Sequence, residues 1–269
     1  MFTDSHCHLT FPQLAENFAS IRAQMREARV TRALCICTTI EEFDDVHALA
    51  LRDEGIWASV GVHPDNEGVT EPSIADLVER AAKPRVVAIG ETGLDYYDLE
   101  GRKGGRGIEA LEWQRDRFRT HIRAAQRAGV PLVIHSRSAA EDTLSILREE
   151  GEGQGSGAGG VFHCFTESME VARQVLDLGY FISFSGIVTF KNAIALQEVA
   201  RFVPDDRLLI ETDSPYLAPT PHRGKLNTPA YVPLVAAKLA ELRGSDPEAI
   251  GALTSANFDR LFSRVREHG

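Results

Sequence analysis

Six side chains of the kinds that bind divalent metal ions stand at the ends of apolar stretches in this sequence. The opening stretch FTDSHCHLT carries two histidines only two residues apart. A lone histidine in an apolar stretch is more often a core residue, whereas a buried acid is costly without a partner. The recurrence of these residue types at one kind of position therefore indicates a metal site. Its predicted ligands are His6, His8, Glu91, His135, His163 and Asp213.

Four imidazoles and two carboxylates exceed what one tetrahedral zinc ion uses, and they suit two divalent ions that share a carboxylate. We expect Glu91 to be that bridge, because it is the central acid of the set and has two oxygens. We expect Asp213 to bind one ion and to orient or deprotonate the attacking water. The predicted chemistry is hydrolysis of an ester, an amide or a phosphodiester, with Glu91 and Asp213 as catalytic residues. The ligand types leave Mg²⁺, Mn²⁺ and Zn²⁺ open.

Eight short apolar stretches recur along the chain, and each precedes a longer stretch with helical spacing. Five of them carry or adjoin the predicted ligands. The predicted strands are MFTDSHC, RALCICT, IWASVGV, RVVAIGE, PLVIHS, GVFHCF, GYFISFS and RLLIETD. The predicted helices include residues 14–28, 111–128, 140–150, 169–178, 229–242 and 247–262. Strands that alternate with helices form a parallel sheet.

The number of strands and the length of 269 residues predict an α/β fold of the (β/α)₈ type, somewhat distorted, with two extra C-terminal helices. We expect a single domain over residues 1–269. No GxGxxG stretch follows the first strand, which disfavours a dinucleotide-binding sheet. In a barrel the carboxyl ends of all strands open onto one rim. Asp4, His6 and His8 share one strand face, and Asp4, one step deeper, is expected to support its neighbours.

Two glycine-rich segments interrupt the alternation, DLEGRKGGRG (98–107) and EGEGQGSGAGG (150–160). Both are expected to be mobile. The first follows a strand, so it belongs to the rim, where its Arg102, Lys103 and Arg106 could reach an anionic substrate. The second precedes a strand and is expected at the opposite end of the barrel.

The composition narrows the class of protein. The net charge of −10 argues against a protein that coats nucleic acid through a broad basic surface. The four cysteines form no disulfide pattern and are expected to be reduced. No stretch approaches the roughly 18 apolar residues of a membrane span, and no secretory signal is evident. The sequence thus predicts a cytoplasmic, monomeric protein with no membrane contact and no obligate protein partner.

Several motifs along nearly the whole chain resemble the TatD family of metal-dependent deoxyribonucleases, within the amidohydrolase-like barrels. They are FTDSHCHL, GVHPD, AIGETGLDYY, LVIHSR, FHCFTES, FSGIVTFK, LLIETDSPYLAP and HRGKLNTPAYV. The resemblance implies a distorted barrel and metal-dependent hydrolysis of DNA from the 3′ end. The resemblance implies the same six metal ligands that the strand ends predicted, from His6 to Asp213.

The resemblance also implies that His63, in GVHP, faces the substrate phosphate. Residue type and rim position make four more side chains candidate phosphate or nucleotide contacts, namely Arg137, Arg223, Lys225 and Asn227. Aromatic side chains that could stack on a base are Tyr96, Tyr97, Phe165 and Tyr216. DNA ends or single strands are therefore the expected substrate, because an acidic surface should bind long duplex poorly.

Other functions remain open on the same residues. An amidohydrolase or phosphotriesterase-like enzyme would often use a carboxylated lysine as the bridge, and no lysine ends a predicted strand. Removal of a D-amino acid from tRNA is a second hydrolase activity attributed to relatives of the family. A non-catalytic barrel that binds metal or a partner is the alternative from another class, although the complete ligand set argues against it.

Overall fold

The structure is a computed structural model, which describes residues 1–101, 104–155 and 157–266. These residues form one parallel sheet of eight strands in the order β1 to β8. The strands are β1 (Phe2–Cys7), β2 (Val30–Cys35), β3 (Ile56–Val60), β4 (Val86–Asp95), β5 (Leu132–Arg137), β6 (Gly160–Phe162), β7 (Phe181–Phe184) and β8 (Leu208–Ile210). A parallel bridge between Cys7 and Ser214 brings the two ends of the sheet together. The predicted (β/α)₈ barrel is therefore confirmed.

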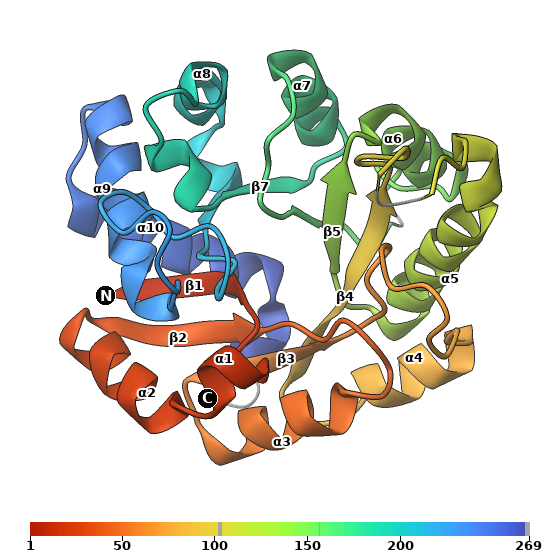
Figure 1. Cartoon of the computed structure of the whole chain (residues 1–269), viewed down its shortest axis with the longest axis horizontal. Coiled ribbons are helices and arrows are strands. Elements are labelled where there is room, and N and C mark those ends of the chain that lie inside the picture. Colours follow the sequence, from red (N-terminus) through yellow and green to blue (C-terminus); the bar gives the residue numbers. More distant parts are fainter. Residues whose placement is uncertain (102–103, 156, 267–269) are drawn as a thin grey trace.

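Helices α2 to α9 surround the sheet and follow one another around it in chain order, whereas α1 and α10 lie inside this ring in the view of Figure 1. The helices are α1 (Pro12–Ala15), α2 (Phe18–Glu27), α3 (Phe43–Arg52), α4 (Ile74–Ala81), α5 (Glu112–Ala128), α6 (Ala140–Glu149), α7 (Met169–Asp177), α8 (Ile194–Phe202), α9 (Val232–Arg243) and α10 (Pro247–Leu261). Short 3₁₀ turns are η1 (Ile108–Leu111), η2 (Gly186–Thr189), η3 (Asp205–Arg207), η4 (Pro229–Tyr231) and η5 (Ser263–Arg266). The two predicted C-terminal helices correspond to α9 and α10.

A small apolar cluster fills the interior of the barrel. It contains one or two side chains from most of the strands, together with Phe258 of α10, Phe262 directly after that helix, and Val265 of η5. Phe258 also lies edge-on to Trp57 of β3, with ring centroids 6.3 Å apart. The last helix thus closes the end of the barrel opposite the rim, and the rim end is left for polar residues.

Several elements differ from their predicted bounds. Strands β6 and β8 end at Phe162 and Ile210, before His163 and Asp213, and residues 229–231 form a 3₁₀ turn before α9. The predicted helix 14–28 is two helices, α1 and α2, with a break at residues 16 and 17. Strand β4 continues four residues beyond Glu91, which was expected to end it, and reaches Asp95. The pairing register with β5 shifts between Ile89 and Thr92, so Glu91 lies at an irregularity inside the strand rather than at its end.

The described part of the glycine-rich segment before β6 contains a buried acid, Glu152. The carboxylate of Glu152 accepts hydrogen bonds from the Gln126 side chain, the backbone N–H groups of Ala158 and Gly159, and the Tyr180 hydroxyl. A buried carboxylate with four donors fixes the chain around it.

Three further expectations concern the cysteines, membrane spans and the glycine-rich segment 98–107. All four cysteines lie within the described residues as free thiols. Among the described helices, none is both long enough and apolar enough to cross a membrane. In the segment 98–107, Arg106 forms an ion pair with Glu67, with nitrogen–oxygen distances of 2.7 and 2.6 Å. Arg102 and Lys103, also expected at the rim, lie outside the described residues.

Candidate metal centre

The ends of β1 and β8 bring three of the predicted ligands together. The Nε2 atoms of His6 and His8 lie 3.2 Å apart. Asp213 Oδ1 lies 3.6 Å from the first and 3.4 Å from the second. The backbone holds this arrangement, because the Asp213 N–H donates to the carbonyl of His6 and the His8 N–H donates to that of Ser214.

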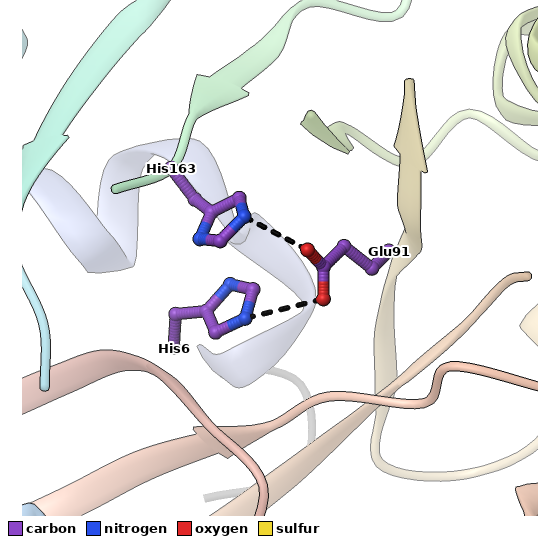
Figure 2. A group of neighbouring side chains, drawn as sticks. All are labelled: His6, Glu91 and His163. Atoms are coloured by element: carbon purple, nitrogen blue, oxygen red, sulfur yellow. Dashed lines mark ion pairs between the residues drawn. The ribbon is translucent and has the colours of Figure 1, made fainter. Parts of the chain in front are cut away.

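Glu91 places its two carboxylate oxygens against different imidazoles. Oε2 lies 3.4 Å from His6 Nε2 and 3.8 Å from His8 Nε2. Oε1 lies 2.9 Å from His163 Nε2 and 3.2 Å from His135 Nδ1. Figure 2 shows the rings of His6 and His163 side by side, each directed at its own oxygen of Glu91. These two rings are stacked with centroids 3.8 Å apart.

The spacing of these atoms fits two divalent ions. Ligand bonds of about 2.0–2.2 Å around a tetrahedral ion put neighbouring ligand atoms roughly 3.4 Å apart. In the first group, His6, His8, Asp213 and Glu91 Oε2, the ligand atoms lie 3.2 to 3.8 Å apart. The second group, His135, His163 and Glu91 Oε1, has separations of 2.9 to 3.3 Å. The donor set thus offers four protein atoms on one side of Glu91 and three on the other.

The charge of the centre also suits cations. Burial by itself raises the pKa of Glu91, but the imidazoles of His63, His163 and His6 outweigh burial and hold that pKa well below its usual range. The pKa of Asp213 is lowered in the same way, against burial, by its contact with His8 and by the other imidazoles. Both carboxylates are therefore ionised near neutral pH, which is the form that binds metal.

Further acids stand behind the histidines. Asp95 Oδ2 lies 3.3 Å from His135 Nε2, and Glu211 Oε1 lies 3.2 Å from His163 Nδ1. Asp4 accepts hydrogen bonds from the backbone N–H groups of His6 and Thr212. A carboxylate behind a histidine fixes the ring and its protonated nitrogen. Asp4 thus has the supporting position that was expected of it.

Asp95 and Glu211 were missed at the level of sequence, although a signal for them exists. Asp95 follows Glu91 by four residues, and Glu211 precedes Asp213 by two. In extended chain these spacings direct side chains to the same face. The alternation that identified His6 and His8 could therefore have identified both acids.

His63 lies at the edge of the second group, with its Nε2 3.4 Å from Glu91 Oε1. Its other ring nitrogen, Nδ1, accepts a hydrogen bond of 3.0 Å from the backbone N–H of Asp65. A neutral imidazole whose Nδ1 accepts carries its proton on Nε2. His63 therefore presents an N–H donor toward Glu91 and the cavity, and this protonated nitrogen has no lone pair for a metal ion.

A cavity of about 570 Å³ lies over the centre. Five of the six predicted ligands line it, together with His63 and two other predicted contact residues, Arg137 and Tyr216. The guanidinium of Arg137 is bonded to Asp95 and packs 4.6 Å from the centre of the Tyr97 ring. Polar side chains that the sequence did not single out, such as Thr38 and Asn66, also line the cavity.

Two predicted contact residues lie elsewhere, and the structure corrects their expected role. Tyr96 is only 6% exposed and donates its hydroxyl to Asp142, so its ring is not available to a base. Asn227 is fully buried, and its side-chain amide donates to the carbonyls of Thr212 and Tyr216. Both side chains use their polar groups within the protein.

The two remaining cationic residues are exposed at the surface and do not line the cavity. Arg223 packs 4.0 Å from the centre of the Phe190 ring. Lys225 follows in the same loop, where its backbone N–H donates to the carbonyl of His222. Of the other aromatic candidates, Phe165 is buried, whereas Tyr97 is half exposed beside Arg137.

Comparison with known proteins gives a consistent result. A family model described as TatD related DNase matches residues 3–263. The uncharacterized metal-dependent hydrolase YcfH of Escherichia coli strain K12 is 44% identical over 263 residues, covering 96% of this chain and 94% of that protein. The 3′-5′ ssDNA/RNA exonuclease TatD of Klebsiella pneumoniae is 32% identical, covering 96% of this chain and 97% of that protein.

A solved structure shows the same arrangement of the chain. The crystal structure of YJJV, a TatD homolog from Escherichia coli K12, superposes with a TM-score of 0.87. Its sequence is 28% identical, and the match covers 97% of this chain and 98% of that one. The similarity thus extends over the whole barrel rather than over a part of it.

Proposed function

The chain belongs to the TatD-related DNase family of metal-dependent hydrolases, and on that premise we propose that it hydrolyses phosphodiester bonds at the 3′ ends of DNA strands. The division of Glu91 between two groups of ligand atoms is the observation that carries this proposal. The relative from Klebsiella pneumoniae, named as a 3′-5′ exonuclease for single-stranded DNA and RNA, supports it. The ligands that we propose are His6, His8, Glu91, His135, His163 and Asp213.

When bound, two divalent ions supply Lewis-acid polarisation of a phosphoryl oxygen and activation of water near neutral pH. Glu91 holds the two ligand groups in one fixed relation, since one buried carboxylate faces both. Asp213 is ionised and directs one oxygen at His6 and His8. We assign its carboxylate the task of orienting the attacking water and accepting a proton from it.

Two side chains at the other side of the cavity suit a phosphodiester. His63 presents its Nε2–H to the space beside Glu91, and a phosphoryl oxygen there can accept that hydrogen bond. Arg137 is a permanently charged side chain in the cavity wall, where Asp95 fixes its guanidinium. These donors favour an anionic substrate over the uncharged amides of an amidohydrolase.

A nuclease assay with defined metal content tests the proposal. Protein freed of metal and reloaded with Mg²⁺, Mn²⁺ or Zn²⁺ should shorten a single-stranded oligonucleotide labelled at its 5′ end, one nucleotide at a time. Glu91→Gln should lower the bound metal per chain and slow turnover roughly a thousandfold or more, because metal polarisation contributes several kcal/mol. Glu170→Gln, an exposed change on α7, is the matched control.

Specific outcomes would contradict the proposal. If metal-loaded protein left DNA, RNA and model phosphodiesters intact, the phosphodiesterase function would be wrong. A D-aminoacyl-tRNA that was deacylated under the same conditions would then favour that alternative. Wild-type turnover in Glu91→Gln would remove Glu91 from the bridging position.

A further inference from the structure

Two short turns at the rim have the same construction. Phe11 follows His8 by three residues, and its backbone N–H donates to the His8 carbonyl at 3.1 Å. Tyr216 follows Asp213 by three residues, and its N–H donates to the Asp213 carbonyl at 3.0 Å. Each turn therefore fixes an aromatic residue directly beside a predicted ligand of the same group.

The two rings form one continuous wall of the cavity. The Phe11 ring stacks on the imidazole of His8, with centroids 4.6 Å apart and an angle of 18° between the planes. The Tyr216 ring meets the Phe11 ring edge-on at 6.3 Å. Both residues line the cavity, and Tyr216 is 52% exposed. Exposed aromatic surface beside a buried polar centre offers a place for a flat apolar group.

The turn that carries Tyr216 is held from beneath. The buried Asn227 amide donates to the Tyr216 carbonyl and, at 2.8 Å, to that of Thr212. The Asn227 N–H donates in turn to the Pro215 carbonyl. These bonds give Asn227 a positioning task in place of the substrate contact that its sequence position implied, and they make the aromatic wall a rigid feature.

The side of the cavity formed by β4 and β5 carries Arg137. Because the strands follow one another in order around the barrel, β4 and β5 lie across it from β1 and β8. Arg137 at the end of β5 lines the cavity there, bonded to Asp95 and packed on Tyr97. Phe11 and Tyr216 thus lie on one side of the cavity, next to Asp213, and the guanidinium of Arg137, paired with Asp95, lies on the other.

We propose that Phe11 and Tyr216 form a subsite for the unpaired base of the terminal nucleotide, while the phosphates of the remaining strand pass Arg137. This inference rests on the proposed nuclease function. Base-on-aromatic stacking accepts every base, because each base has a π face, so the subsite selects for an unpaired end rather than for a sequence. A base pair at a duplex end must open before its nucleotide can enter.

Paired substrates test the subsite. One oligonucleotide ends in a normal 3′ thymidine, and the other ends in an abasic tetrahydrofuran residue with the same phosphodiester. Wild-type protein should cleave the normal end at least about tenfold faster in kcat/KM, given the usual worth of one stacked base. The double variant Phe11→Ala/Tyr216→Ala should lose that preference by slowing on the normal end alone. Tyr216→Phe, which keeps the ring, should retain the preference for the normal end.

Two controls accompany this comparison. Phe202→Ala removes an aromatic residue of α8 that is 41% exposed and lies outside the cavity lining, and it should keep the preference. Metal content per chain is measured in every variant, because Phe11 packs on His8. The double variant must keep the wild-type metal content for its kinetics to report on the base.

Binding of 2-aminopurine deoxynucleoside monophosphate gives a readout that needs no cleavage. Stacking quenches its fluorescence, so wild-type protein should quench it and the double variant should not. Equal cleavage of the two oligonucleotides by wild type, or equal quenching by wild type and the double variant, would overturn the subsite. Quenching that depends on the two rings, without cleavage of any oligonucleotide, would instead overturn the nuclease function and leave the subsite standing.

Discussion

Glu91, His63 and Asp213 show how much of the chemistry depends on individual atoms. Each oxygen of Glu91 faces its own set of imidazole nitrogens, and Asp213 completes only one of the two sets. His63 stands beside the other set and directs a protonated nitrogen at it. The four atoms of the first group and the three atoms of the second would each hold one divalent ion.

The tautomer of His63 leads to a prediction about metal binding. His63→Ala should keep the wild-type metal content, since its Nε2 carries the proton, and should slow phosphodiester cleavage roughly 100-fold or more, as expected when one preorganised donor is removed. His63→Gln, which retains an N–H donor, should recover part of the rate. Metal analysis of purified protein together with kcat checks this.

A second readout tests the same assignment without turnover. In protein labelled with ¹⁵N at histidine, the NMR shifts of His63 should mark Nδ1 as unprotonated and Nε2 as protonated, both before and after metal is added. Loss of one ion per chain in His63→Ala, or a proton on Nδ1, would make His63 a ligand instead.

At the scale of elements, helix α5 supports the loop that carries His63. The buried His121 of α5 donates from Nδ1 to the Arg117 carbonyl and accepts at Nε2 from the backbone N–H of Val62. Arg117 in turn donates to the carbonyls of His63 and Asn66. The position of the His63 donor thus depends on a helix that contributes no ligand to the centre.

His121 also predicts how stability changes with pH. Burial lowers its pKa to about 4, from an ordinary value of 6.5. Above pH 6.5 the ring is neutral in both the folded and the unfolded protein, and its contribution is fully present. Below pH 6.5 the unfolded chain binds a proton that the folded chain refuses, so the free energy of unfolding should fall by roughly 3 kcal/mol as the pH approaches 4.

Urea unfolding at pH 7.5 and pH 4.5 measures this effect. His121→Gln should be less stable than wild type at pH 7.5, because Val62 loses its ring acceptor. The stability gap between the two proteins should narrow at pH 4.5, since the variant lacks the titrating ring. A gap of the same size at both pH values would show that His121 is not the group responsible.

Substitution of Glu152 should lower the stability of the protein without lowering its activity. Its carboxylate joins α5, the glycine-rich loop and Tyr180 at the end of the barrel away from the centre. Glu152→Ala should lower the free energy of unfolding by about 2–4 kcal/mol, because several buried donors lose their acceptor. Turnover per folded molecule should be unchanged at low temperature. Gln154→Ala, an exposed change in the same loop, should affect neither quantity, and a loss of turnover in Glu152→Ala would link this loop to the centre.

At the scale of the whole molecule, charge is distributed unevenly. The chain has a net charge of −10, and the guanidinium of Arg137, paired with Asp95, lies in the wall of the cavity. We propose that the chain is one domain and that it contacts DNA only at the cavity over the metal centre. Phosphate recognition should then be local, with few counterions released.

Salt dependence tests this local recognition. For a short single strand, kcat/KM should fall less than about tenfold between 50 and 200 mM salt, as expected for one or two neutralised phosphates. Closed circular duplex should bind poorly and stay intact, because it presents no end. A steep salt dependence, or tight binding to the circle, would indicate an extended binding surface and contradict the proposal.

The sequence by itself determined the barrel and the rim. Strand–helix alternation depends on local periodicity, and period-two spacing places His6 and His8 on one face wherever the strand lies. The ends of apolar stretches likewise placed His135, His163 and Asp213 near strand ends, whereas Glu91 lies inside β4. Short-range geometry of this kind is encoded within a few residues, so the pattern alone was enough to predict it.

Only the tertiary structure determined the hydrogen-bond partners and the burial of the polar side chains. Tyr96 and Asn227 have residue types suited to substrate, yet Asp142 and two backbone carbonyls engage their polar groups. The proton of His63 is fixed by the Asp65 amide, and the loop before β6 is fixed by Glu152. Burial and hydrogen-bond partners arise between segments that meet only after folding, and a linear pattern contains no record of those distances.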